Sequence, residues 1–312
     1  MNRGDRNTGI VLALAAAATS GISVFVNSYG VRAVPDATVY TTAKNLVAAA
    51  VLVAVTTIVA VGARRPAGDP AVGRRLRPLQ MVGLAAVAVI GGSVAFVLFF
   101  EGLAQASSSQ AAFIHKTLVV WVALLAVPLL GERLRAAHVA AIAVLVVGQA
   151  VLVGGLSGFR FGGGEVLILA ATLLWSVETV LAKRLLRDVP VGTVAVARMA
   201  GGVALLVAWV AVSGRWSALA GLGSEGWTWA AATGVVLAGY VALWFSALAL
   251  APAVDVTAVL VLAAVVTGVL NIAIKGSAVT AWTGTGLLIV LLGGALAAVA
   301  ATRRRPEVAL AR

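Results

Sequence analysis

Apolar residues run in long stretches along the chain, and polar residues concentrate in the short segments between them. Runs of about 18 or more apolar residues are typical of helices that cross a membrane. The pattern predicts ten such helices, with approximate bounds at 9–28, 38–62, 79–103, 109–130, 137–154, 166–181, 191–212, 227–250, 253–274 and 279–301. No interval between them is long enough for a separate soluble domain.

The composition excludes a soluble globular protein. Hydrophobic residues make up 62% of the chain and charged residues only 11%. Soluble domains have about 45–50% apolar and about 25% charged residues. We therefore expect an all-α polytopic membrane protein whose main surroundings are the lipid bilayer.

The residues that enzymes and metal sites use are scarce or badly spaced. The chain has no cysteine, so it has neither a disulfide nor a thiolate metal site. Its two histidines and scattered carboxylates show no metal-ligand spacing, and neither a glycine-rich nucleotide loop nor a Ser-His-Asp arrangement is visible. The net charge of +12 comes from short loops rather than from a basic stripe with stacking aromatics. We expect no enzyme activity, no cofactor, no metal and no nucleic-acid partner.

The distribution of lysine and arginine predicts the orientation in the membrane. With the N-terminus in the cytoplasm, sixteen of the 23 basic residues fall on the cytoplasmic side and four on the outer side. Loops rich in lysine and arginine stay in the cytoplasm. We expect a protein of the cytoplasmic membrane with both termini in the cytoplasm.

The two halves of the chain resemble each other. A shift of 145 residues places Gly131 on Gly276, and a shift of 155 places Pro35 on Pro190. We predict two five-helix repeats, 9–155 and 164–301, joined by a glycine-rich hinge. Five is an odd number, so the second repeat enters the membrane upside down, as in many secondary transporters. The charged start and apolar run at the N-terminus also resemble a signal peptide, but the repeat requires this first helix.

The chain resembles the drug/metabolite transporter superfamily, EamA type, in three features. It has ten predicted spans in two halves, a Gly-Leu-Ala sequence before the fourth span, and Leu-Gly-Glu (130–132) at the end of that span. The resemblance covers about residues 10–301. Trp175 resembles the early-helix tryptophan of that family, and on this resemblance it is a candidate substrate-binding residue. The usual mid-helix proline is absent near Val119, and Ser277 stands where the repeat would place a second glutamate. The resemblance implies transport, often efflux, of amino acids or other metabolites, with the fifth and tenth spans packed at the periphery.

Lys116 is the most informative polar residue, because an ionisable side chain inside a spanning helix is a functional-site hypothesis by default. It lies about eight residues into its span, roughly 12 Å deep at 1.5 Å per residue. It could bind an anionic group such as a carboxylate, or it could form a fixed salt bridge. His115 lies about 100° away around the same helix. It could relay protons or, as we favour, pack neutral and hydrogen-bonded between helices.

Glu178 in the sixth span is the predicted partner of Lys116. A protonatable carboxylate beside a lysine is a plausible device for coupling transport to protons; a structural ion pair is the alternative. Lys44 and Arg198 occupy related places in the second and seventh spans. We expect them to be structural anchors to lipid phosphate or to a loop carbonyl.

Three further residues could line a cavity with Lys116. Tyr240 and Trp244 are four residues apart and share one face of the eighth span, and Asn27 lies in the first span. Simple packing is the alternative for the two aromatic residues. Asp255 is expected to be a helix-start carboxylate rather than a gate residue, and His138 to have no special role.

The sequence therefore predicts a secondary transporter that works by alternating access. The expected substrate is a small polar metabolite, such as an amino acid or a related carboxylate, moved outward across the cytoplasmic membrane. Coupling is expected to the proton gradient or to no ion. No ATP-binding motif is present, so we do not expect primary pumping unless another chain supplies the ATP site. A monomer and a homodimer both fit. The alternative is a membrane scaffold that transports nothing, with dry, ion-paired central residues.

Overall fold

The computed structural model describes residues 3–62, 76–106, 108–155 and 161–302. In this part of the chain the secondary structure is helical, without strands. The first half contains α1 (Arg3–Ala33), α2 (Ala37–Gly62), α3 (Pro78–Val89), η1 (Ile90–Val94), α4 (Ala95–Leu103), α5 (Ser108–Lys116), α6 (Leu118–Leu130) and α7 (Ala136–Leu152). The second half contains α8 (Gly163–Leu185), α9 (Val191–Val196), η2 (Ala197–Gly201), α10 (Gly202–Val212), α11 (Trp216–Ala220), α12 (Ser224–Leu250), α13 (Ala253–Leu260), α14 (Ala263–Lys275) and α15 (Ala281–Thr302).

The ten predicted spans are all present as helices. Nine spans within the described residues are long and apolar enough to cross a membrane, and α7 is shorter, with 17 residues. The first helix extends beyond the predicted 9–28 at both ends, because its polar flanks continue the helical hydrogen bonding. The chain is thus a multi-pass membrane protein. The basic segment 63–75, residues 156–160 of the hinge and the arginines after Thr302 lie outside the described residues.

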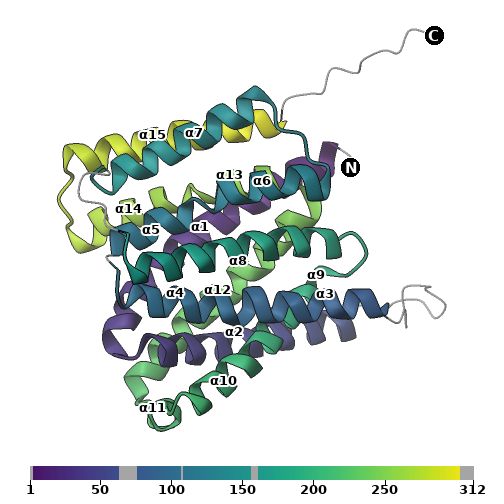
Figure 1. Cartoon of the computed structure of the whole chain (residues 1–312), viewed down its shortest axis with the longest axis vertical. Coiled ribbons are helices and arrows are strands. Elements are labelled where there is room, and N and C mark those ends of the chain that lie inside the picture. The colour runs from purple at the N-terminus through teal and green to yellow at the C-terminus, as the bar shows by residue number, and fades with distance from the viewer. Residues whose placement is uncertain (1–2, 63–75, 107, 156–160, 303–312) are drawn as a thin grey trace.

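The start of α1 and the end of α15 lie at the same end of the helix bundle, on the right in Figure 1. We call this end the terminal face and the other end the opposite face. α7 and α15 pack side by side along one edge of the molecule (Figure 1), as expected for the fifth and tenth spans. Glycines permit this close packing, because a Cβ on Gly286 would lie 2.6 Å from the Leu152 backbone.

The fourth and ninth spans each contain a hydrogen bond between residues three apart, at related positions in the two halves. In the fourth span, Thr117 accepts from the Val120 N–H at 2.8 Å, a bond between residues three apart. In the ninth span, Leu262 accepts from the Val265 N–H at 3.0 Å in the same way. These two positions are separated by the 145-residue shift that relates the halves. A short 3₁₀ turn inside a helix often marks a hinge, and here it forms without the proline that the family resemblance predicts near Val119.

The third and seventh spans cross where each contains a π-helical turn, η1 and η2. The contact is made by backbone: a Cβ on Gly92 would lie 2.1 Å from the carbonyl oxygen of Arg198, and a Cβ on Gly202 would lie 2.4 Å from the carbonyl oxygen of Gly92. Real Cβ atoms cannot approach this closely, so the two spans touch here only because both residues are glycines. This crossing fixes the position of Arg198 in the bundle.

Packing differs between the two ends of the bundle. α13, in the half of the ninth span near the terminal face, is buried along its whole length and packs against α6. In α14, which continues toward the opposite face, Ala263 alone is buried among residues 263–275. Within the described residues, α5 and α14 make no contact comparable to that of α6 with α13. The interior is therefore closed more tightly toward the terminal face.

Candidate functional site

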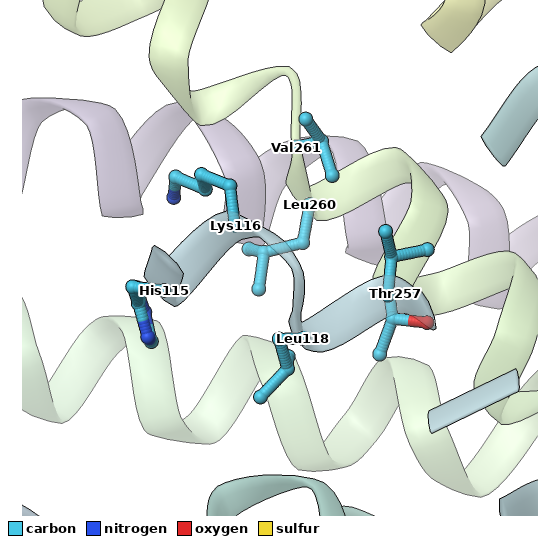
Figure 2. Close-up of a pocket in the computed structure, with 7 residues that line it drawn as sticks. His115, Lys116, Leu118, Thr257, Leu260 and Val261 are labelled. Atoms are coloured by element: carbon cyan, nitrogen blue, oxygen red, sulfur yellow. The ribbon is translucent and has the colours of Figure 1, made fainter. Parts of the chain in front are cut away.

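A small hollow lies at the two 3₁₀ turns, between the fourth and ninth spans (Figure 2). Its cavity volume is only about 10 Å³, compared with ~300–1,000 Å³ for typical ligand pockets. In this conformation it has room for about one water molecule and is closed to metabolites. It is lined by His115, Lys116, Leu118, Val119, Thr257, Leu260 and Val261.

Lys116 ends α5 and points away from His115 (Figure 2). Its side chain is half-buried. Across the described part of the chain, its ammonium has neither a hydrogen bond nor an ion pair with a carboxylate. A lysine at this depth carries a charge that its protein surroundings leave uncompensated.

Glu178 pairs with Arg198 and not with Lys116, so the predicted partnership is wrong. The Arg198 Nε donates to Glu178 Oε1 at 2.6 Å, and Nη2 donates to Oε2 at 3.4 Å. Both residues are buried, with 3% and 7% of their surface exposed. The prediction failed because Arg198, in the π-helical turn η2 of the seventh span, contacts Glu178 on α8. Arg198 is also neither at a lipid headgroup nor on a loop carbonyl, which corrects the role expected for it.

Lys44 is buried as well, with 5% of its surface exposed, which corrects the expected anchor to lipid phosphate or a loop carbonyl. Its ammonium donates to Asn27 Oδ1 at 3.3 Å. It lies 4.6 Å from the centre of the Phe100 ring and 5.5 Å from that of Tyr40. Asn27 Oδ1 also accepts from the Tyr40 hydroxyl at 2.9 Å. Asn27 therefore belongs to a cluster around Lys44, and it does not line the hollow.

His115 packs in an aromatic group. Its ring centre lies 5.0 Å from that of Trp175 and 5.4 Å from that of Phe99. Trp175 Nε1 donates to the Gly91 carbonyl at 3.1 Å, within the π-helical turn η1. His115 Nδ1 is buried and has no hydrogen bond in the described structure. The packing of His115 agrees with expectation, whereas the predicted hydrogen bond is not formed at Nδ1.

Tyr240 and Trp244 stack on each other, with ring centres 6.1 Å apart. Trp244 is buried in the main hydrophobic cluster, against which Tyr240 packs. Of the seven predicted site residues, only His115 and Lys116 line the hollow. The other five (Asn27, Trp175, Glu178, Tyr240 and Trp244) do not line it.

A polar network at the terminal face was not predicted from the sequence. Asp255 at the start of α13 accepts from Arg6 Nη2 at 2.8 Å, and His138 Nε2 lies 3.1 Å from its other oxygen. This joins α1, α7 and α13, so His138 has a specific contact after all. Asp255, expected to be only a helix-start carboxylate, connects three helices. The sequence indicates Asp255 as a notable residue, because it is an acidic side chain in the first turn of a spanning helix. The local sequence does not indicate that its partner is Arg6, 249 residues away.

Glu132, from the Leu-Gly-Glu ending of the fourth span, caps the N-terminus of α13. Its two carboxylate oxygens accept from the N–H groups of Ala253 at 2.7 Å and Val254 at 3.1 Å. Burial raises the pKa of Glu132, while these backbone hydrogen bonds oppose the rise. The motif therefore ties the end of the fourth span to the start of the ninth.

The opposite face has a separate network of charged residues. Arg215 contacts Glu101 at 2.5 Å through Nη1 and Asp36 at 3.5 Å through Nε. The hydrogen bond that Arg215 donates to the Glu101 carboxylate raises the pKa of Arg215, so this guanidinium stays charged. Among the described residues, no group of three or more His, Cys, Asp or Glu side chains is placed to hold a metal ion.

Comparison with known proteins gives a family match over both halves. The sequence pattern of the EamA-like transporter family matches residues 7–154 and 162–299. A protein of known crystal structure is similar in fold, with a TM-score of 0.73 over 94% of this chain and 98% of that chain, at 20% sequence identity. No curated protein matched the sequence.

Proposed function

Because the chain belongs to the EamA-like transporter family, we propose that it is a secondary transporter that moves small polar metabolites across the cytoplasmic membrane by alternating access. We infer export as the direction, with both termini in the cytoplasm as the loop charges indicate. The preferred substrates are amino acids or related carboxylates. The proposal extends the family assignment to a substrate class, a direction and a mechanism.

One observation carries the proposed substrate class: the uncompensated lysine at the hollow. Lys116 lies between the two halves at mid-span, where inverted-repeat transporters place their substrates. Placing an unpaired ammonium in such surroundings costs several kcal/mol. A bound carboxylate would offset that cost, so the site favours anions over neutral or cationic compounds.

The uneven packing supports alternating access. Near the terminal face α13 is fully enclosed, and Glu132 and Asp255 tie its first turn to other helices. Toward the opposite face α14 is more open. Transport requires the reverse arrangement in a second state, and the paired 3₁₀ turns at Thr117 and Leu262 are suitable places for the helices to bend.

The location of Glu178 bears on proton coupling. Arg198 supplies its counter-charge, so a shared proton switch between Lys116 and Glu178 has no support from the geometry. This buried pair is also what a non-transporting scaffold would contain. The scaffold alternative does not account for Lys116, which has no such partner in the described structure.

Flux measurements test the proposal. Purified parent protein and the Lys116→Met and Lys275→Met variants would be reconstituted in liposomes and assayed with a labelled panel of amino acids and carboxylates. Lys275 is the control, because it lies at the end of its span, with its ammonium over the rings of Phe25 and Tyr29. We expect flux of at least one anionic compound that Lys116→Met abolishes and Lys275→Met retains. Absence of flux for the whole panel, with folded protein, would favour the scaffold.

A further inference from the structure

Lys44 is a second interior lysine without an acidic partner among the described residues. A lysine ammonium carries three N–H donors. Among the described residues, one acceptor meets these donors: Asn27 Oδ1, at the long distance of 3.3 Å. The faces of Phe100 and Tyr40 provide partial compensation, worth about 2 kcal/mol for a desolvated cation over a ring. Lys44 thus keeps donors and charge available for another group.

The inverted repeat supplies a comparison for this residue. Arg198 occupies the related place in the second half, and Glu178 on α8 neutralises it. In the first half the preceding helix α1 offers Lys44 only the amide of Asn27. The deep interior therefore contains one compensated cation, Arg198, and two uncompensated ones, Lys44 and Lys116.

The two uncompensated lysines lie at similar depth. Lys44 is seven residues from the start of α2 and Lys116 eight from the start of α5. Both starts are at the opposite face, so the two residues are about 10–12 Å from it at 1.5 Å per residue. Aromatic rings connect their surroundings: Phe100 lies under Lys44, its ring centre is 5.5 Å from that of Phe99, and Phe99 packs on His115.

A buried hydroxyl next to Lys44 is also unused. Thr41 lies three residues earlier on α2, on the same side of the helix. Its Oγ1 is buried and has no hydrogen bond in the described structure. Unpaired buried polar groups are costly and rare. A hydroxyl donor and an ammonium on one helix face form a suitable pair for the oxygens of an anionic group.

We propose that Lys44, with Thr41, is a second anion subsite, and that the transported substrate carries two anionic groups, as a dicarboxylate does. One group binds at Lys116 and the other at Lys44, with the aromatic residues between them in contact with the apolar part of the substrate. This inference rests on the proposed function and narrows its substrate class from carboxylates to dianions.

Two probes of equal length separate one anionic group from two: suberate, whose two carboxylates are joined by a chain long enough to pass the rings between the lysines, and suberamate, in which an amide replaces one carboxylate. Their binding would be measured by concentration-dependent thermal stabilisation of the purified full-length protein, and their flux in liposomes. The variants are Lys44→Met, Lys116→Met and the control Lys275→Met. Lys44→Met should fold, because replacing a buried charge by an apolar side chain of similar volume is often neutral or stabilising.

We expect the parent to bind suberate more tightly than suberamate. Loss of one hydrogen-bonded charge contact should weaken suberate binding in Lys44→Met by about tenfold or more and leave suberamate within about twofold. Lys116→Met should weaken both probes, and Lys275→Met neither. Equal binding of the two probes by the parent, or a Lys44→Met effect that is the same for both or absent, would overturn the inference.

The two proposals fail in different ways. Lys44-dependent binding of suberate without any flux would support the subsite and refute transport. Flux of single-anion compounds that depends on Lys116 and ignores Lys44 would support transport and refute the subsite.

Discussion

At the residue scale, the interior contains two kinds of buried cation. Arg198 is neutralised by a carboxylate at 2.6 Å, whereas Lys116 and Lys44 are not neutralised by any described residue. The first kind holds helices together, because removal of either partner leaves a charge that neither water nor protein compensates. The second kind has no counter-charge among the described residues. From this difference we propose a structural role for Glu178 and anion binding for the two lysines.

The Glu178–Arg198 pair should behave as a structural unit. Glu178→Leu alone leaves Arg198 unpaired and should destabilise the protein by about 3–5 kcal/mol, whereas the double variant Glu178→Leu with Arg198→Met should recover most of this loss. Thermal unfolding of the purified variants measures both effects. A double variant no more stable than Glu178→Leu would show that the pair is needed for more than mutual compensation.

The residues that carry charge could be identified from the sequence, but their partners could not. Lys116 and Glu178 stand out because ionisable residues are rare in spanning helices. Which helix faces meet depends on the crossing of the third and seventh spans, and that crossing depends on two π-helical turns whose positions no periodicity indicates. The Asp255–Arg6 contact likewise joins the first and ninth spans, 249 residues apart, which local patterns cannot pair.

At the element scale, departures from regular α-helix occur where spans meet. The turns η1 and η2 meet through Gly92 and Gly202, and the 3₁₀ turns of the fourth and ninth spans meet at the hollow. The Leu-Gly-Glu motif contributes at a third junction, because Glu132 caps α13. Hydrophobic patterns predicted the spans themselves well, since length and apolarity suffice for that.

The π-turn crossing should not tolerate a methyl group. A Cβ on Gly92 would lie 2.1 Å from a backbone oxygen, and overpacking of this kind typically costs about 1–3 kcal/mol. Gly92→Ala should therefore lower the thermal stability of the purified protein and reduce flux, by displacing Arg198. Gly239→Ala is the matched control, since nothing lies within 4 Å of a Cβ at that helical position. Equal stability of the two variants would show that the third and seventh spans separate easily.

At the scale of the whole molecule, the predicted EamA-like, all-helical fold is confirmed, with two repeats over nearly the full chain. The interior is enclosed around α13 toward the terminal face and less so around α14. Ion pairs form at both faces, Arg6–Asp255 at one and Arg215–Glu101 at the other, while Lys44 and Lys116 have no acidic partner among the described residues. These features agree with the carrier that we propose, closed toward the terminal face.

Counterflow is the measurement that tests alternating access most directly. Liposomes containing the protein are loaded with an unlabelled anionic substrate, and entry of the labelled compound is followed. A carrier whose single site faces the two sides in turn should take up label faster when unlabelled substrate is inside, and Lys116→Met should lose this acceleration. Label entry that is absent, or that does not respond to the internal substrate, would contradict transport by alternating access through the site at Lys116.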